Sequence, residues 1–381
     1  MADPNHAADQ TTARSVLIHR EIFQLGVLIL IAVGAFLVTR AVAANNRDMS
    51  LKDAAELYRR GQYALREGRI EESIESFRRA TVKNRVDQRY VLALAHGLEL
   101  KGDTEGARAL LLALRESAPE DPDINLQLAR LAAARSDVTE ALRFYHNALY
   151  APWTPEQSAA RRGIRFELIR FLVTHDQASR ADSELLALTS DLPDDTELRL
   201  EAGRLFTQAG DYAHALDQFQ RVLRLAPENG EALAGAGRAA FQLGDYVLAR
   251  TYLRRAPDKA NDIAASREIV DLVLSNDPLV NRLGSSERRR RLVANLAYAR
   301  GRLNSCLEKT PGVQTDADAM ALQSEAEALD QQLKLQSALE QDTVESGVDL
   351  IDRVERLVVQ KCGPATTLDQ ALVLIGRRHG S

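Results

Sequence analysis

The stretch ELRLEAGRLFTQAGDYAHALDQFQRVLRLAP, which runs from Glu197 to Pro227, decides the fold of this chain. It holds a Gly-Asp-Tyr turn, then an alanine, then a large residue four positions later. Gly210 ends one helix, because a residue without Cβ tolerates positive φ, and Pro227 stops a second helix. Ala215 lets the two helices approach closely, and Phe219 fills the core between neighbouring pairs. The stretch therefore predicts a hairpin of two helices.

The pattern returns in the next stretch, EALAGAGRAAFQLGDYVLARTYLRRA, where Gly244, Ala249 and Leu253 take the corresponding places. Working back along the chain, the same frame fits residues 54–87, 88–121, 122–152 and 162–195. An insertion from Trp153 to Arg161 precedes the last of these units, in which Asp176 stands where the turn glycine belongs. One match would be weak, because Ala and Leu at helical spacing occur in any bundle. Six units in tandem over residues 54–263 predict a helical repeat array, followed by a capping helix at 264–275.

These units resemble the tetratricopeptide repeat, whose period of about 34 residues they share. The resemblance covers roughly half of the chain. It implies a right-handed superhelix of helical hairpins, in which the first helix of each hairpin lines a concave groove. In this family the groove typically binds peptides or partner proteins.

The family frame also predicts which side chains enter that groove. In the first helix of each unit a small residue recurs at one place in the repeat. The residues that directly follow it are, unit by unit, Gln62, His96, Arg130, Arg170, Arg204 and Arg238. The residue four positions earlier is Tyr58, Leu92, Leu126, Phe166, Leu200 and Ala234. The resemblance thus places an apolar stripe beside a basic one.

Four of these groove residues are arginines, and they permit two interpretations. They are Arg130, Arg170, Arg204 and Arg238. They form an arginine ladder that cradles an acidic or carboxylate-bearing peptide, since the guanidinium fork pairs bidentately with carboxylates. Alternatively, they are ordinary solvated charges that pair with neighbours such as Glu197, Glu201 and Glu231, which the abundance of arginine favours. The chain lacks the lysine-and-asparagine pattern of family members that clamp a C-terminal carboxylate, so that function is not expected.

Composition predicts an all-α protein. Aromatic residues make up only 5% of the chain, and the apolar residues are mostly Ala and Leu, which favour helices over strands. The net charge of −5 is too balanced for nucleic-acid binding, which needs a concentrated basic footprint. Two cysteines are too few for a disulfide-rich secreted scaffold.

Near the N-terminus, residues 22–44 are expected to form a transmembrane helix, after a tail at 1–21 and before a linker at 45–53. The 18 residues IFQLGVLILIAVGAFLVT from Ile22 to Thr39 span about 27 Å as a helix, close to the ~30 Å hydrocarbon core. A buried core helix and a cleavable signal peptide ending near Ala41-Val42-Ala43 are the alternatives. The apolar run exceeds the usual 7–15 residues of a signal peptide, so we expect an uncleaved anchor. Basic residues lie on both sides of the span and do not fix its orientation.

Beyond the repeats, residues 285–378 predict a module of four helices. Their apolar residues are, helix by helix, Leu292, Leu296, Ala299 and Leu303; Met320, Ala326, Leu329 and Leu333; Val344, Val348, Ile351 and Val358; and Leu368, Leu372 and Ile375. A run of four arginines, Arg288 to Arg291, opens the first helix against its dipole. The run either meets an anionic partner or, more simply, pairs with Glu287 and nearby acids.

The two cysteines end the first and third of these helices. If the helices pack up-down-up, the first and third are parallel, and Cys306 and Cys362 lie at the same end of the module. A disulfide between them would require an oxidising compartment, which favours a periplasmic or extracytoplasmic location. The alternative is two unrelated buried thiols.

No pattern in the sequence predicts catalysis. The histidines are scattered and none has zinc-ligand spacing, and there is neither a phosphate loop nor a GxSxG elbow. We therefore expect no catalytic residue, no cofactor and no metal. The sequence predicts a membrane-anchored scaffold that binds proteins in the cell envelope, the alternatives being an adaptor that faces the cytoplasm and an enzyme in the C-terminal module.

Overall fold

The computed structural model describes residues 5–258, 261–336 and 339–379. Within these ranges every regular element is helical, as the composition predicts, with seventeen α-helices and two short 3-10 turns. The chain divides into two compact units, Met1–Ile164 and Arg165–Ser381.

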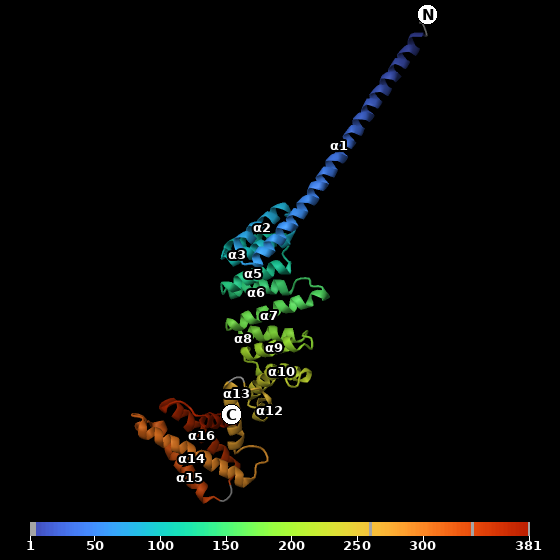
Figure 1. Ribbon diagram of the computed structural model, residues 1–381. Coiled ribbons are helices and arrows are strands. Elements are labelled where there is room, and N and C mark those ends of the chain that lie inside the picture. The colour runs from blue at the N-terminus through green and yellow to red at the C-terminus, as the bar shows by residue number, and fades with distance from the viewer. Residues whose placement is uncertain (1–4, 259–260, 337–338, 380–381) are drawn as a thin grey trace. The chain divides into compact units, whose positions relative to one another are not determined.

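Twelve of the helices form the six hairpins that the repeats predict. In the first unit the pairs are α1 (Asn5–Arg66) with α2 (Ile70–Lys83), α3 (Gln88–Lys101) with α4 (Thr104–Ser117), and α5 (Pro122–Ala134) with α6 (Val138–Leu149). A fourth pair joins α7 (Ser158–Thr174), in which the unit boundary falls, to α8 (Ala178–Thr189). The second unit continues with α9 (Thr196–Ala209) and α10 (Tyr212–Leu225), then α11 (Gly230–Gln242) and α12 (Tyr246–Arg255). Within each unit, successive hairpins stack in chain order (Figure 1).

The hairpin turns need a residue in the left-handed region of φ. Gly210 and Gly244 supply it with φ of 86° and 74°, as the sequence predicts. Asp176 adopts φ of 56° in the degenerate unit, and Ser136 adopts 57° in the unit before it. Aspartate tolerates this region better than most residues, so the turn survives without its glycine.

Small residues on the first helices receive large side chains from the second helices. Ala215 and Ala249 are fully buried, and Phe219 is only 2% exposed. A Cβ on Gly203 or on Gly235 would come within 2.7 Å or 2.5 Å of the Phe219 ring, so both positions must stay small. The predicted core of the repeats is confirmed at these residues.

The insertion between the third and fourth hairpins is held against the end of α6. It contains a 3-10 turn, η1 (Pro155–Gln157), and leads directly into α7. The indole Nε1 of Trp153 donates to the carbonyl of Ala148 at 2.9 Å, and Nε of Arg161 donates to the carbonyl of Leu149 at 2.9 Å.

Helix α1 is one continuous helix from the apolar segment into the first hairpin. The linker expected at 45–53 is helical as well, which corrects that prediction. The stretch NNRDMSLKD contains neither proline nor glycine, and Lys52 pairs with Asp48 at 2.7 Å along the helix. Lys83 of α2 binds Asp53 at 3.1 Å and fixes the end of the stretch to the hairpin.

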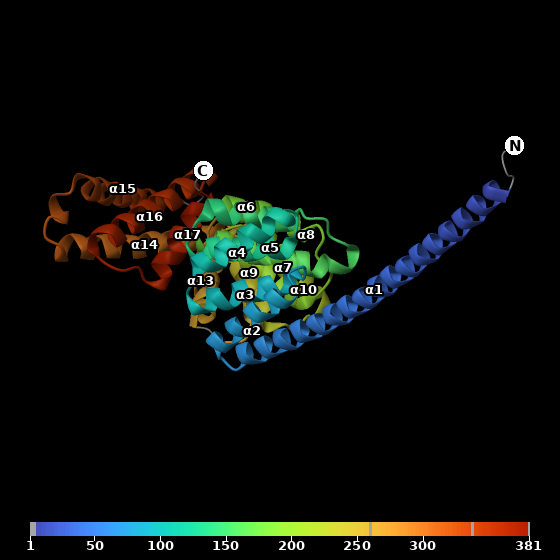
Figure 2. The same cartoon turned by 90° about the horizontal axis from the view of Figure 1, so that it is seen from above.

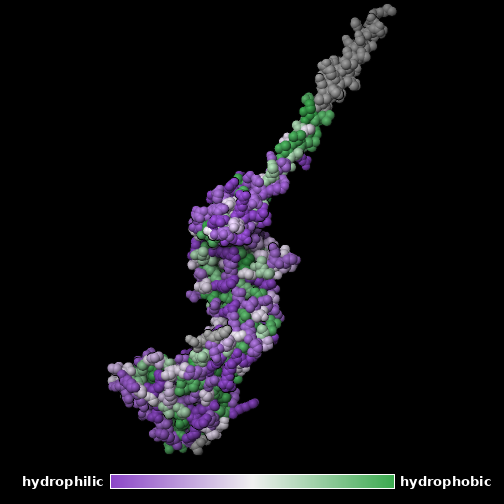
Figure 3. Space-filling view, viewed as in Figure 1, coloured by the Kyte–Doolittle hydropathy of each residue, from purple (hydrophilic) through white to green (hydrophobic). Residues whose placement is uncertain are grey.

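The apolar segment of α1 is uncovered. Its side chains from residue 28 to residue 49 are all exposed, and Leu30, Phe36 and Val38 expose 73%, 63% and 65% of their surface. The segment forms the hydrophobic band on this helix in Figure 3. The alternative of a buried core helix is therefore wrong. By length and composition, α1 is able to cross a membrane.

The C-terminal part of the second unit consists of α13 (Asn261–Asn276), α14 (Ser285–Lys309), η2 (Val313–Thr315), α15 (Ala317–Leu335), α16 (Gln341–Cys362) and α17 (Thr367–His379). Helices α14, α15 and α16 lie side by side in Figures 1 and 2. The predicted apolar stripes are buried, except that Leu329 and Leu368 are half-buried and Met320 is exposed. Met320 is 55% exposed, and Ala319 lies in the core instead, because Ala319 shares the helical spacing of Leu322, Ala326 and Leu333.

Helix α13 packs on the last hairpin but is not the end of its core. The buried residues from α11 to α17 form one continuous core, so the C-terminal helices share their interior with the last repeat. Thr367 of α17 donates to Glu268 of α13 at 2.9 Å, and the guanidinium of Arg378 lies 5.8 Å from the ring centre of Tyr246 in α12. The open apolar edge of the repeats is thus covered by α13 and α17 together.

The arginine run at the start of α14 holds other helix ends. Arg290 and Arg291 pair with Glu287, as the simpler interpretation predicts. Arg291 also donates to the carbonyls of Leu274 and Asp277 at 3.0 Å each, and Arg289 donates to the carbonyls of Leu333 and Gln336. These carbonyls end α13 and α15, where positive charge complements the helix dipole.

Candidate functional site on the concave face

In the first unit, the predicted groove residues surround one cavity of about 460 Å³, here named the N-terminal hollow. Its lining consists of Tyr58, Gln62, Leu65, Phe77, Arg89, Leu92, Ala93, His96, Glu99, Asp123, Leu126, Gln127 and Arg130. Three first helices contribute most of this lining, because α1, α3 and α5 each present the same face in successive hairpins. All six groove residues that the frame places in this unit, Tyr58, Gln62, Leu92, His96, Leu126 and Arg130, are among them.

The floor of the N-terminal hollow is aromatic. The ring of Tyr58 lies 5.7 Å from the ring of Phe77 and 5.1 Å from the ring of Tyr90, both tilted. Phe77 and Tyr90 are buried, which fixes Tyr58 from below. Leu92 and Leu126 are half-buried beside it. Such partly exposed apolar groups gain free energy when a partner covers them.

The basic groups of the hollow already have partners. Arg89 makes two hydrogen bonds to Asp87, at 2.9 Å and 2.7 Å, and these bonds hold the pKa of the Asp87 carboxyl below its usual value. Nδ1 of His96 lies 3.3 Å from a Glu99 carboxylate oxygen. Arg130 is likewise engaged within the chain.

Two acceptors on α5 remain open. Among the described residues, none reaches the buried amide oxygen of Gln127, and the Asp123 carboxylate is exposed to solvent. Partial burial raises the pKa of Asp123, the nearby Asp121 raises it further, and Arg130 lowers it. The sequence frame did not single out Asp123 or Gln127, although they are four residues apart and therefore lie on one face of the helix.

In the second unit, the frame residues are placed differently. Phe166 and Leu200 are each 3% exposed, so they belong to the core and not to an open groove. Each arginine pairs with an acid two helices farther along the chain: Arg170 of α7 with Glu201 of α9 at 3.0 Å, Arg204 of α9 with Glu231 of α11, and Arg238 of α11 with Asp262 of α13 at 2.9 Å. At these three positions the structure favours the interpretation of ordinary ion pairs.

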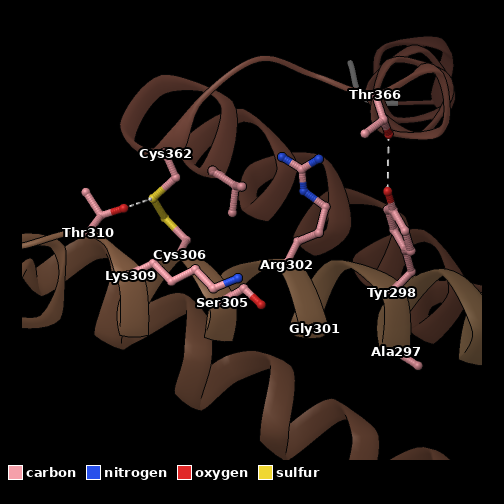
Figure 4. Close-up of a pocket in the computed structure, with 11 residues that line it drawn as sticks. Ala297, Tyr298, Gly301, Arg302, Ser305, Cys306, Lys309, Thr310, Cys362 and Thr366 are labelled. Carbon is pink, nitrogen blue, oxygen red and sulfur yellow. Dashed lines mark hydrogen bonds between the residues drawn. A yellow bond between two sulfur atoms is a disulfide. The ribbon is translucent and has the colours of Figure 1, made fainter.

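A second cavity, of about 560 Å³ and here named the C-terminal hollow, lies between α14 and α16. A disulfide joins Cys306 to Cys362 in its wall, with the two Cα atoms 5.6 Å apart (Figure 4). The Thr310 hydroxyl donates to Sγ of Cys362 at 3.2 Å. The disulfide closes the parallel ends of α14 and α16, the arrangement that the up-down-up packing predicts.

A buried charge cluster lies close to this cavity. Arg302 of α14 pairs with Asp369 of α17 and lies 3.5 Å from a carboxylate oxygen of Glu355 in α16. Asp369 also accepts from the hydroxyl of Tyr298 at 2.8 Å. The Glu355 side chain is fully buried and receives no hydrogen bond from any described residue. Burial raises the pKa of Glu355 to about 7, although Arg302 opposes the shift.

These arrangements serve packing and recognition. No group of three or more His, Cys, Asp or Glu side chains in the described ranges is placed to hold a metal ion. Arg302 braces three helices of the C-terminal module, and the N-terminal hollow offers an apolar floor with acceptors at its side.

Comparison with known proteins identifies the repeats. The family model of the tetratricopeptide repeat matches residues 92–154 and 200–264. The chain thus contains tetratricopeptide repeats, which are typical of non-enzymatic scaffolds, and a long apolar helix precedes them. No curated protein matches it.

The solved structures to which this chain is similar include three repeat proteins. YrrB, described as a TPR protein with an unusual peptide-binding site, is 22% identical, with 50% of this chain and 93% of that one covered at a TM-score of 0.39. A tetratricopeptide repeat protein from Parabacteroides merdae is 11% identical, with 79% and 99% covered at 0.39. The C-terminal part of a repeat protein from Cytophaga hutchinsonii is 11% identical, with 80% and 99% covered at 0.42.

Proposed function

We propose that this chain is a membrane-anchored scaffold that binds a segment of a partner protein in the N-terminal hollow and organises a complex in the cell envelope. The observation that carries the proposal is the hollow itself. Three successive hairpins present half-buried apolar side chains, an unpaired amide oxygen and an exposed carboxylate around one cavity of about 460 Å³. A concave site of this size and composition suits a side chain and the adjoining backbone of a peptide.

Anchoring is supported by the uncovered apolar helix. An isolated helix that exposes its side chains from residue 28 to residue 49 would aggregate in water, whereas a bilayer covers it. Because α1 continues into the first hairpin, that hairpin joins the apolar segment without a break in the helix.

An extracytoplasmic location of the repeats is supported by the Cys306–Cys362 disulfide, since such bonds persist in oxidising compartments and are rare in the cytosol. The adaptor that faces the cytoplasm would require both thiols to stay reduced. Labelling of intact cells with an impermeant thiol reagent, before and after reduction, separates the two. Labelling only after reduction supports the envelope location, and free thiols that react only in opened cells contradict it.

The binding role is tested by photo-crosslinking in cells. A benzoylphenylalanine in place of Leu92 points its reactive group at the hollow, and the same residue in place of Val82, which is 65% exposed on α2, serves as the control. A crosslinked partner obtained from position 92 and not from position 82 is the expected result. No partner from position 92 would overturn the proposed function.

A further inference from the structure

The charges of the N-terminal hollow indicate the chemistry of its occupant. Arg89 is neutralised by Asp87, His96 contacts Glu99, and Arg130 is engaged, so the hollow offers no free cation to an acidic peptide. An acidic occupant would have to displace an internal carboxylate. The expectation of an acidic partner, which rested on the arginine ladder, therefore finds no support in this hollow.

The groups of the N-terminal hollow that remain available to an occupant are hydrogen-bond acceptors. The Asp123 carboxylate and the Gln127 amide oxygen lie on one face of α5 and both line the hollow. The Gln127 oxygen is buried without a donor among the described residues, which costs free energy until a ligand supplies one, whereas the Asp123 carboxylate is exposed to water. A lysine or arginine of an occupant would satisfy Asp123 with a charge-assisted hydrogen bond, and a backbone or side-chain N–H would satisfy Gln127.

The apolar floor of the N-terminal hollow places a second requirement on the occupant. Tyr58, Leu92 and Leu126 expose apolar surface between these acceptors and the opposite wall. An apolar side chain that covers this surface adds hydrophobic free energy to the polar contacts. The hollow thus calls for an apolar residue with a basic residue next to it.

The position of the hollow along α1 restricts where the occupant comes from. If the span ends near Ala44, Tyr58 and Gln62 lie 14 and 18 residues farther along the same helix. At ~1.5 Å per residue these are roughly 21 Å and 27 Å from the bilayer, and any tilt of the helix shortens the distance. An extended chain covers 27 Å in roughly eight residues.

We propose that the N-terminal hollow binds a basic membrane-proximal segment of a second membrane protein, with an apolar side chain on the Tyr58 floor and a lysine or arginine on Asp123. This inference rests on the proposed function. The segment lies within roughly ten residues of the partner's own span, because the rigid helix α1 holds the hollow that close to the bilayer. Lysine and arginine suit the ends of spans, where their long side chains can reach the polar surface.

The test uses the full chain in intact cells with benzoylphenylalanine in place of Leu92, and mass spectrometry of the crosslinked partner peptide. The expected peptide carries Lys or Arg beside an apolar residue and lies next to a predicted span. Asp123→Asn should lower the crosslinking yield by up to about fivefold, as expected for loss of an ion pair to an exposed carboxylate. Glu197→Gln is the matched control, because Glu197 occupies the first turn of α9 as Asp123 does that of α5, and it should leave the yield unchanged.

Three results would overturn the inference while leaving the proposed function intact. They are an acidic crosslinked segment, a partner without a span, and a yield that Asp123→Asn does not change. Circular dichroism of each variant establishes that the helices are intact, so that a fall in yield reports the contact. The absence of any crosslink from position 92 would instead overturn the proposed function, and with it this inference.

Discussion

In the first unit, Gln62 and His96 occupy the frame positions that Arg204 and Arg238 occupy in the second. Around the first pair lies an open cavity with an aromatic floor. Each arginine of the second pair binds an acid two helices farther along the chain, and the residue four positions before Arg204, Leu200, is buried. Equivalent positions of the repeat therefore line an open cavity in the first unit, whereas in the second unit they form ion pairs within the chain.

The largest expected effect on stability comes from the hydrophobic core of the second unit. Phe219→Ala removes a ring that is 2% exposed and should lower the free energy of unfolding by about 3–5 kcal/mol. Leu92→Ala, in the half-buried floor of the N-terminal hollow, should cost less than about 2 kcal/mol and should mainly weaken partner capture. Urea unfolding followed by circular dichroism measures both. Equal losses would contradict the distinction between a closed face and a binding face.

The carboxyl groups of the two units extend the comparison, because Asp123 borders an open cavity whereas Glu355 is sealed in the core. Since burial raises the pKa of Glu355 to about 7 from 4.5, the folded state holds an extra proton between these pH values. Stability should therefore fall as pH rises through this window, by on the order of 3 kcal/mol, and stay low above it.

Glu355→Gln tests this directly. The variant keeps the shape of the side chain but cannot ionise, so thermal unfolding between pH 5 and pH 8 should lose the part of the pH dependence that Glu355 contributes. Asp369, which Arg302 and Tyr298 already satisfy, stays in place as the internal reference. A variant whose pH profile matches that of the parent chain would show that Glu355 is not the responsible group.

Alanine substitutions at two glycines should change the free energy of unfolding by smaller amounts and in opposite directions. Gly235→Ala places a methyl group 2.5 Å from the Phe219 ring and should destabilise the second unit by about 1–3 kcal/mol. Gly163→Ala in α7 meets no atom within 4 Å and should stabilise by about 0.5–1 kcal/mol, because alanine restricts the unfolded chain. Unfolding midpoints of the two variants should move in opposite directions, and a common direction would contradict the packing described for Phe219.

The smallest effect is expected for the ion pairs of the second face. Arg204 and Glu231 are each 46% exposed, so a double-mutant cycle with Arg204→Gln and Glu231→Gln should give a coupling of about 0.2–1 kcal/mol that weakens with salt. A coupling free energy several times larger would mean that this ion pair contributes substantially to the stability of the repeats.

Sequence predicted the hairpins well because their signals are local. Gly210, Gly244 and the alanines of the second helices act within one or two turns of helix, and even Asp176 adopts the turn conformation that its place in the frame requires. The six groove residues of the first unit follow from the same periodicity. Cys306 and Cys362 could be paired because helix direction alone brings them to one end.

Other features depend on contacts that no local pattern specifies. The helical stretch at 45–53 is fixed in part by Lys83 from another helix. Which acid each arginine selects is decided by side chains about thirty residues apart. Gln127 was missed because an unpaired acceptor is recognisable only when all possible donors are in place.

The central claim is that partner binding belongs to the face of the first unit and not to that of the second. The most direct measurement compares photo-crosslinking from position 92 with photo-crosslinking from position 204, each carrying benzoylphenylalanine in the otherwise unchanged chain. The account predicts a partner captured from position 92 and none from position 204. Capture of the same partner at least as efficiently from position 204 would contradict it.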